Sequence, residues 1–186
     1  MEIFGVPVPA MLSQLLLGLV NGSFYAILSL GLAVIFGLLN VINFAHGALF
    51  MMGAILTWMA MTYFNISYWV MLIASPLVVG AFGILIERLL LRWIYKLDHL
   101  YGLLLTLGLT LLIEGVFRSI YGVSGLAYDT PDQLVGATNL GFMLLPNYRA
   151  WVVVASVVVC LATWFVIEKT RLGAYLRAGT ENPRLV

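Results

Sequence analysis

The sequence has 186 residues, of which 63% are hydrophobic and 9% are charged, and its mean hydropathy is +1.07. Soluble domains carry roughly 25% charged residues, so this composition excludes a soluble globular protein and indicates an integral membrane protein. The formal net charge of +1 identifies no partner, because the charges are segregated between loops, and the single cysteine, Cys160, can form no disulfide within the chain.

The N-terminal half of the chain is almost free of charge, with no Asp, Glu, Lys or Arg between Ile3 and Ile86. A helix needs about 20 apolar residues to cross a bilayer core about 30 Å thick. By this measure the tract holds three crossings: Ala10–Leu39, which is longer than one crossing needs, Ala45–Tyr63 and Tyr68–Ile86. The break between the second and the third is Phe64-Asn65-Ile66-Ser67.

Small residues recur every four positions along the first crossing. One row is Gly18, Gly22 and Ala26, and a second row is Ser29, Ala33 and Gly37. Such rows let helix backbones approach closely, because apolar contact alone does not drive helix association in lipid. We interpret the first row as ordinary packing between membrane helices.

Charged segments separate two further apolar stretches in the second half. A charged loop spans residues 87–99, followed by a fourth crossing, Leu100–Tyr121, a turn-rich loop, Gly122–Tyr148, and a last crossing, Ala150–Ile167. Glu114 precedes Arg118 by one helical turn, which favours a structural ion pair over a proton-relay role for the carboxylate. The predicted fold class is all-α, a polytopic bundle of transmembrane helices.

Basic residues indicate which side of the membrane is the cytoplasm. Three lie in the 87–99 loop and four in the 168–186 tail, whereas the two opposing segments carry only Arg118 and Arg149. Two crossings separate the loop from the tail, so both lie on one side, and the positive-inside rule makes that side cytoplasmic. Five crossings put the N-terminus outside. A second crossing or a re-entrant segment within residues 30–47 would put it inside, so we expect five to six crossings.

One polar stretch interrupts the apolar tract, Gly37-Leu38-Leu39-Asn40-Val41-Ile42-Asn43-Phe44-Ala45-His46-Gly47. An unpaired polar group costs several kcal/mol in lipid, so these side chains must meet a protein partner or line a wet cavity. Flanking glycines allow a helix to open or another backbone to come close. We predict that a buried helix pair bends here around a translocation path. A neutral His46 hydrogen-bonded between helices is an equally good interpretation of that residue, and we assign it no catalytic role.

The C-terminal tail, residues 168–186, contains a signal for the start of a helix. Asn182 is a good N-cap, and Pro183 suits the first helical position. Three residues follow, too few to sustain a helix, which suggests that the chain is cut short. Charge alone predicts a basic anchor on the inner leaflet.

Two segments resemble the permease subunits of branched-chain amino acid ABC importers. The first is Asn21-Gly22-Ser23-Phe24-Tyr25-Ala26-Ile27 together with the polar stretch at 37–47. The second, Thr170-Arg171-Leu172-Gly173 with Arg177-Ala178 and Glu181-Asn182-Pro183, resembles the cytoplasmic loop by which that family contacts its ATPase. The resemblance covers essentially the whole chain, and permeases for urea and other amides are similar in the first segment.

The resemblance implies a multi-pass subunit of the bacterial plasma (inner) membrane that imports a zwitterion with an aliphatic side chain. Its partners would be a second permease subunit (in a homo- or heterodimer), two ATP-binding subunits, a periplasmic substrate-binding protein and the lipid bilayer, with no nucleic acid. Four residues would lie near the translocation path: Asn40, Asn43, His46 and Gly47. Six residues of the 168–186 coupling loop would couple to the ATPase: Arg177, Thr180, Glu181, Asn182, Pro183 and Arg184.

The chain itself is not expected to be an enzyme. It has no Gly-x-x-x-x-Gly-Lys-Ser/Thr phosphate loop, so a partner subunit would bind and hydrolyse ATP, and we assign the chain no catalytic residue, cofactor or metal site. An intramembrane enzyme would need a nucleophile with its base, or a cluster of metal ligands, within the bilayer. One buried histidine and one Glu near an interface do not supply either.

Two other interpretations stay open. Family members continue for several crossings beyond the coupling loop, whereas this sequence ends inside it. We therefore expect the N-terminal portion of a single transmembrane permease domain, as a fragment, a truncated gene product or a frameshifted frame, and such a piece alone could be a non-transporting membrane fragment. The other interpretation is a urea or amide ABC permease.

Overall fold

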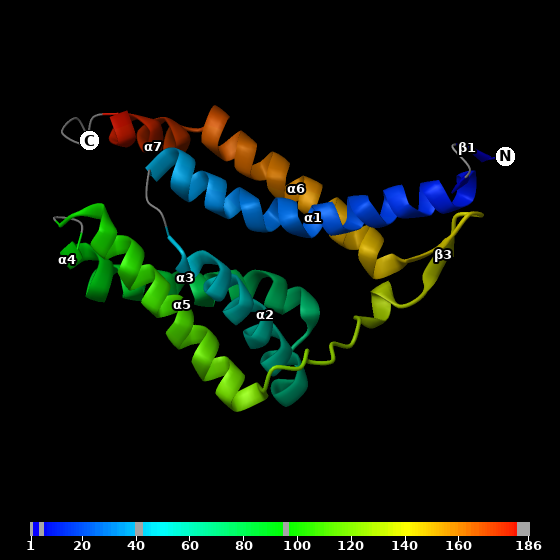
Figure 1. The fold of residues 1–186 in the computed structure, drawn as a ribbon, viewed down its shortest axis with the longest axis horizontal. Coiled ribbons are helices and arrows are strands. Elements are labelled where there is room, and N and C mark those ends of the chain that lie inside the picture. The colour runs from blue at the N-terminus through cyan, green and yellow to red at the C-terminus, as the bar shows by residue number, and fades with distance from the viewer. Residues whose placement is uncertain (1, 4–5, 40–42, 95–96, 182–186) are drawn as a thin grey trace. The chain divides into compact units, whose positions relative to one another are not determined.

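The computed structural model describes residues 2–3, 6–39, 43–94 and 97–181, and over these residues the chain is mainly helical (Figure 1). The long helices are α1 (Val8–Leu39), α2 (Ala45–Phe64), α3 (Tyr68–Ile86), α5 (His99–Tyr121) and α6 (Asn147–Lys169). Shorter helical elements are the π-helical η1 (Glu87–Leu91), α4 (Arg92–Ile94), the 3-10 turn η2 (Asp132–Leu134) and α7 (Arg171–Glu181). Two antiparallel pairs join β1 (Glu2–Ile3) to β2 (Val6–Pro7) and β3 (Ala137–Asn139) to β4 (Leu144–Pro146).

Five segments of the described chain are long and apolar enough to cross a membrane, which confirms the predicted all-α polytopic fold. They are Val8–Gly37, Ala45–Phe64, Tyr68–Ile94, Leu100–Tyr121 and Asn147–Lys169. Within the described residues there is no sixth span of this kind. Helix α1 runs without a break to Leu39 and α2 begins at Ala45, so the few residues between them are too short for another crossing.

The first helix is longer than one bilayer requires. Its 32 residues, at 1.5 Å each, give a length of about 48 Å, against a hydrocarbon core of about 30 Å. A helix with this excess must tilt or extend beyond the membrane. The first predicted crossing, Ala10–Leu39, therefore lies within one continuous helix.

The charged loop predicted over residues 87–99 is wrong in its first part. The chain continues from α3 through η1 and α4 as helix to Ile94, and Leu89 and Trp93 on this extension are exposed. Leu and Arg are good helix formers, so charge at the membrane surface is not a reason for a helix to end. The next helix has a regular start, because Asp98 Oδ1 accepts a hydrogen bond from the Leu100 N–H at 3.1 Å.

The break predicted between the second and third crossings is confirmed. Helix α2 ends at Phe64, and Asn65 caps it with a left-handed backbone (φ 50°) and an N–H that donates to the Ala60 carbonyl. Asparagine is one of the few residues that adopt this conformation readily at a helix end. Helix α3 then begins at Tyr68, one residue after Ser67.

The turn-rich loop predicted over Gly122–Tyr148 contains η2 and the β3–β4 hairpin, and α6 begins at Asn147, slightly before the predicted boundary. Gly122, with φ of 80°, ends α5. Trp58 Nε1 donates to the Ala127 carbonyl at 2.9 Å, and the Trp58 and Tyr121 rings meet edge to face with centroids 5.6 Å apart. These contacts hold the first part of the loop against the ends of α2 and α5.

The chain divides into two compact units, which we describe separately. Unit 1 comprises residues 1–39 and 130–186 and contains α1, α6 and α7; unit 2 comprises residues 40–129 and contains α2, α3 and α5. In unit 1, α6 packs along α1, and the Ser156 hydroxyl donates to the Ser23 carbonyl at 3.2 Å. In unit 2, α2 packs against both α3 and α5, and the Ser75 hydroxyl donates to the Gly53 carbonyl at 2.8 Å.

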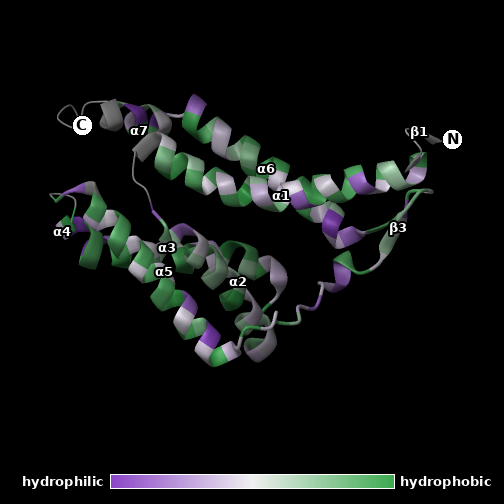
Figure 2. Cartoon of the chain, viewed as in Figure 1, coloured by the Kyte–Doolittle hydropathy of each residue, from purple (hydrophilic) through white to green (hydrophobic). Residues whose placement is uncertain are grey.

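Large apolar side chains cover the outside of both units. Figure 2 shows hydrophobic residues along the long helices, and Leu15, Ile73 and Leu111 are examples that are each more than 60% exposed. A soluble protein rarely exposes apolar surface on this scale, whereas lipid tails accept it. The interior contacts, in contrast, include buried hydroxyls, namely Ser23, Ser75, Thr106 and Ser156.

The first small-residue row does not pack closely within the described chain. A Cβ placed on Gly18 or Gly22 would meet nothing within 4 Å. The side of α1 that packs in unit 1 instead carries Val20 and Ser23, which are 2% and 7% exposed. Gly18 and Gly22 therefore lie on a face of α1 that the other helices of unit 1 leave open.

Candidate functional site

The end of the polar stretch forms the start of helix α2, where Asn43 accepts hydrogen bonds from the first turn of that helix. Asn43 Oδ1 accepts a hydrogen bond from the Ala45 N–H at 2.9 Å, and the Asn43 carbonyl accepts one from the His46 N–H at 3.4 Å. The first N–H groups of a helix have no partner within it, so a side-chain oxygen just before the helix satisfies one of them. Asn43 therefore has a structural role at this helix start.

Helix α5 supplies a further hydrogen-bond acceptor to this segment. The Phe44 N–H donates to Thr106 Oγ1 on α5 at 3.3 Å. Thr106 is 1% exposed, and its hydroxyl hydrogen can point to the Gly102 or Leu103 carbonyl, at 3.0 and 3.1 Å, which leaves the oxygen free to accept. Thr106 thus fixes where the start of α2 meets α5 inside the apolar unit 2.

Three of the four residues predicted to lie near the translocation path are close together at the start of α2. Asn43 and His46 are half-buried at the start of α2, and Gly47 is exposed beside them. A Cβ on Gly47 would meet nothing within 4 Å, so no described neighbour requires a glycine there. Asn40 lies outside the described residues. That these residues line a translocation path stays a prediction.

Thr106 is the residue that the sequence interpretation missed. It lies in the apolar run of α5, where a threonine that bonds to its own helix is common and carries no special signal. Its importance comes from the Phe44 N–H, which is 62 positions away in the chain. Only the packing of α2 against α5 shows that this hydroxyl has a second partner.

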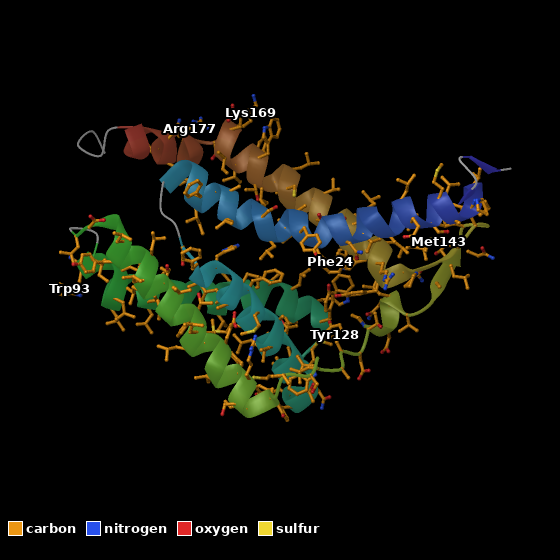
Figure 3. All side chains as sticks on the ribbon, in the orientation of Figure 1. Phe24, Trp93, Tyr128, Met143, Lys169 and Arg177 are labelled. Carbon is orange, nitrogen blue, oxygen red and sulfur yellow. The ribbon has the colours of Figure 1, made fainter. Side chains whose placement is uncertain are left out.

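The predicted coupling segment contains helix α7, although it was expected as a loop. Figure 3 places Arg177 close to the corner between α6 and α7, where Lys169 also lies. Arg177 Nη1 donates to the Ile167 carbonyl at 2.6 Å and lies 3.2 Å from Glu168 Oε2. Thr180 and Glu181 are part of the α7 backbone, whereas Asn182, Pro183 and Arg184, including the predicted helix start, lie outside the described residues.

Two other features bear on the chemistry of the chain. Arg118 and Glu114 are 3.4 Å apart on α5, which confirms the predicted ion pair, and with the Arg118 side chain 65% exposed the pair is weak. Across the part of the chain that the structure describes, no three His, Cys, Asp or Glu side chains gather as a group that could hold a metal ion.

Comparison with known proteins gives a family match over most of the chain. A family model described as "Branched-chain amino acid transport system / permease component" matches residues 14–186. The high-affinity branched-chain amino acid transport system permease protein BraD of Pseudomonas aeruginosa is 27% identical over 185 residues, 94% of this chain and 60% of the relative. The corresponding protein LivH of Escherichia coli is 24% identical, again over 94% of this chain and 60% of the relative.

An archaeal relative extends the match. The probable branched-chain amino acid transport permease protein LivH of Methanocaldococcus jannaschii is 29% identical over 179 residues, which is 90% of this chain and 54% of that protein. The chain therefore spans little more than half the length of the curated relatives it matches. No solved structure matches the chain.

Proposed function

The chain belongs to the family of branched-chain amino acid transport system permease components, and on this premise we propose that it acts as the membrane-spanning subunit of an ATP-driven importer of branched-chain amino acids. With five apolar spans it is a multi-pass protein of the plasma (inner) membrane. The family is a class of transport permeases and not of enzymes. The relatives' names supply the proposed substrate, a zwitterion with an aliphatic side chain.

The proposed mechanism is alternating access. ATP binding and hydrolysis in two partner subunits push on the segment 168–186, and the helices rock around a path that is open to one side of the membrane at a time. A second permease subunit and a periplasmic substrate-binding protein complete the transporter. The absence of a phosphate loop from the 186 residues supports hydrolysis by a partner.

The observation that carries the proposal is the polar start of α2. Asn43 and His46 are half-buried in a unit whose long helices expose many large apolar side chains, and the Phe44 N–H donates to a hydroxyl of α5. Intramembrane polar groups of this kind usually face a cavity or another helix and mark the route of a solute. We therefore propose that Asn40, Asn43, His46 and Gly47 lie along the path.

Uptake measurements test the path assignment. We expect His46→Leu or Asn43→Leu, introduced into the complete transporter, to lower uptake of radiolabelled leucine about tenfold, as the loss of about 1.4 kcal/mol of binding would. Asn21→Leu is the matched control, because Asn21 is an exposed asparagine elsewhere in the apolar region. Unchanged uptake with normal membrane insertion would leave Asn43 and His46 as packing residues. Competition by urea instead of leucine would favour the amide permease.

Co-purification tests the coupling assignment. We expect the tagged chain to capture the ATP-binding subunit from detergent-solubilised membranes, and deletion of residues 180–186 to weaken that capture. Reversal of charge at Arg177 and Arg184 should reduce capture without lowering the amount of chain in the membrane. A chain that inserts normally but captures no ATP-binding subunit would be a non-transporting membrane fragment.

A further inference from the structure

Hydrogen bonds from Thr170 and Arg177 to carbonyls of α6 hold the corner between α6 and α7. Only Thr170 separates the two helices, and its hydroxyl donates to the Val166 carbonyl within the last turn of α6. From the second turn of α7, Arg177 Nη1 reaches back to donate to the Ile167 carbonyl at 2.6 Å. The last carbonyls of a helix lack partners within it and carry partial negative charge, so a guanidinium satisfies such a carbonyl well.

Gly173 lies where the first turn of α7 comes closest to the backbone of α6 at Ile167. It is buried, and a Cβ added to it would overlap the Ile167 carbonyl oxygen, the same atom that accepts from Arg177. A backbone atom cannot move aside as a flexible side chain can. The first turn of α7 can therefore pack on the end of α6 in this way only with glycine at position 173.

The corner is continuous with the packing of unit 1. Helix α7 contacts both α6 and α1, and α6 is joined to α1 farther along by the Ser156 hydroxyl, which donates to the Ser23 carbonyl. A displacement of α7 therefore has a direct route into two of the membrane-spanning helices. That route requires a fixed angle at Thr170, because a free hinge there would absorb the displacement.

The ion pair contributes less than the carbonyl contact. Arg177 and Glu168 are 3.2 Å apart, but their side chains are 42% and 53% exposed, and exposed ion pairs are weak. The pair orients the guanidinium, while the Ile167 carbonyl is the group that links the two helices. The Arg177 guanidinium therefore acts mainly through its hydrogen bond to the Ile167 carbonyl.

We propose that Arg177, Glu168 and Gly173 form a brace that fixes the angle between α6 and α7, so that α7 moves as one body with α6. This inference rests on the proposed function, in which the 168–186 segment receives the push of the ATP-binding subunit. Arg177 is then a positioning residue, which supports capture of that subunit by holding α7 in place.

Distance measurements on the full chain in lipid nanodiscs test the brace without any partner. In a Cys160→Ala background, spin labels replace Val158 on α6 and Tyr175 on α7, both of which are exposed. We expect a single narrow distance distribution, which Arg177→Ala and Gly173→Ala each broaden and Arg177→Lys partly restores. Arg171→Ala is the control, because it removes the same charge from the exposed start of α7. Unchanged distributions in both brace variants would overturn the proposal.

A double-mutant cycle in the complete transporter separates the brace from a direct partner contact. We expect Arg177→Ala and Gly173→Ala each to lower leucine uptake per ATP hydrolysed by about tenfold, within the range for residues that carry coupling, and the double variant to lose little more. A direct contact would instead make Arg177→Ala weaken capture with an unchanged distance distribution, while Gly173→Ala leaves capture intact; that result overturns the brace. If the unaltered chain captures no ATP-binding subunit, the proposed function fails, and the distance measurements alone decide the brace.

Discussion

The face of α2 that carries Gly53 and the face of α1 that carries Gly18 and Gly22 are packed in opposite ways. A Cβ at Gly53 would lie 3.3 Å from Ser75 Oγ and 3.5 Å from Val79 Cγ2, both on α3. At Gly18 and Gly22 a Cβ would meet nothing within 4 Å. In unit 2 a glycine thus sets the distance between two helices, whereas in unit 1 the glycines of α1 lie off the contact surface. Small residues stabilise a helix pair only where a neighbouring backbone uses the space.

The largest effect is expected from filling the Gly53 contact. Gly53→Leu forces α2 and α3 apart and breaks the hydrogen bond from the Ser75 hydroxyl to the Gly53 carbonyl, so we expect a loss of about 3 kcal/mol of stability. The measurement is the SDS concentration at which helical circular dichroism falls in mild-detergent micelles. Gly18→Leu is the matched control and should leave the midpoint close to wild type. Equal losses in both variants would contradict the comparison.

A smaller loss is expected at the contact between α2 and α5. Thr106→Val keeps the shape of the side chain but leaves the Phe44 N–H without its acceptor inside unit 2, which should cost about 2 kcal/mol. Thr110→Val is the control, because the Thr110 hydroxyl donates to the Thr106 carbonyl of its own helix. The same SDS titration measures both. If Thr110→Val lowers stability as much as Thr106→Val, the link to Phe44 is not the reason.

The corresponding contact in unit 1 should matter less. Ser156→Ala removes the hydroxyl that donates to the Ser23 carbonyl, and hydrogen bonds between membrane helices contribute about 0.6 kcal/mol on average. Thr163→Val removes a hydroxyl that bonds within α6 at an exposed position and serves as the control. A loss above that of Thr106→Val would show that unit 1 depends on polar contacts more than unit 2 does.

The smallest effect is expected at the open face of α1. Gly18→Ala and Gly22→Ala add a methyl group into open space, so stability of the isolated chain should stay within about 0.5 kcal/mol of wild type. The informative measurement is the oligomeric state by crosslinking in membranes. Unchanged stability with altered association would show that a partner helix, and not this chain, packs on the glycine row.

Much of the fold could be predicted because an apolar stretch of about 20 residues in a membrane protein is most simply a spanning helix. The five spans, the break at 64–67 and the ion pair between Glu114 and Arg118 are all confirmed. The charged segment after Ile86 misled the prediction, because charge reports the position of the membrane surface and not the end of a helix. The packing predicted for the row of Gly18 and Gly22 stays a prediction, because spacing along a helix does not identify which neighbour packs on it.

The candidate site was only partly predictable. The polar character of Asn43 and His46 is evident in an apolar tract, whereas the partner of the Phe44 N–H could not be inferred from local pattern. The sequence also presents Arg177 as a basic residue of the segment that resembles the ATPase-coupling loop, without showing what its side chain contacts. Its contact with the Ile167 carbonyl depends on the turn at Thr170 and on the space left at Gly173.

The sequence by itself determined that this chain is a membrane protein with five or six crossings and where its polar stretch lies, because the cost of placing charge and unpaired backbone in lipid is large and depends on composition and length. The tertiary structure alone decided which hydroxyl accepts from which backbone N–H, which glycine is a contact and which faces open space, and where Arg177 points. Those outcomes depend on how the helices pack, where a shift of a few tenths of an ångström makes or breaks a contact, and the residue types along one helix do not encode that packing.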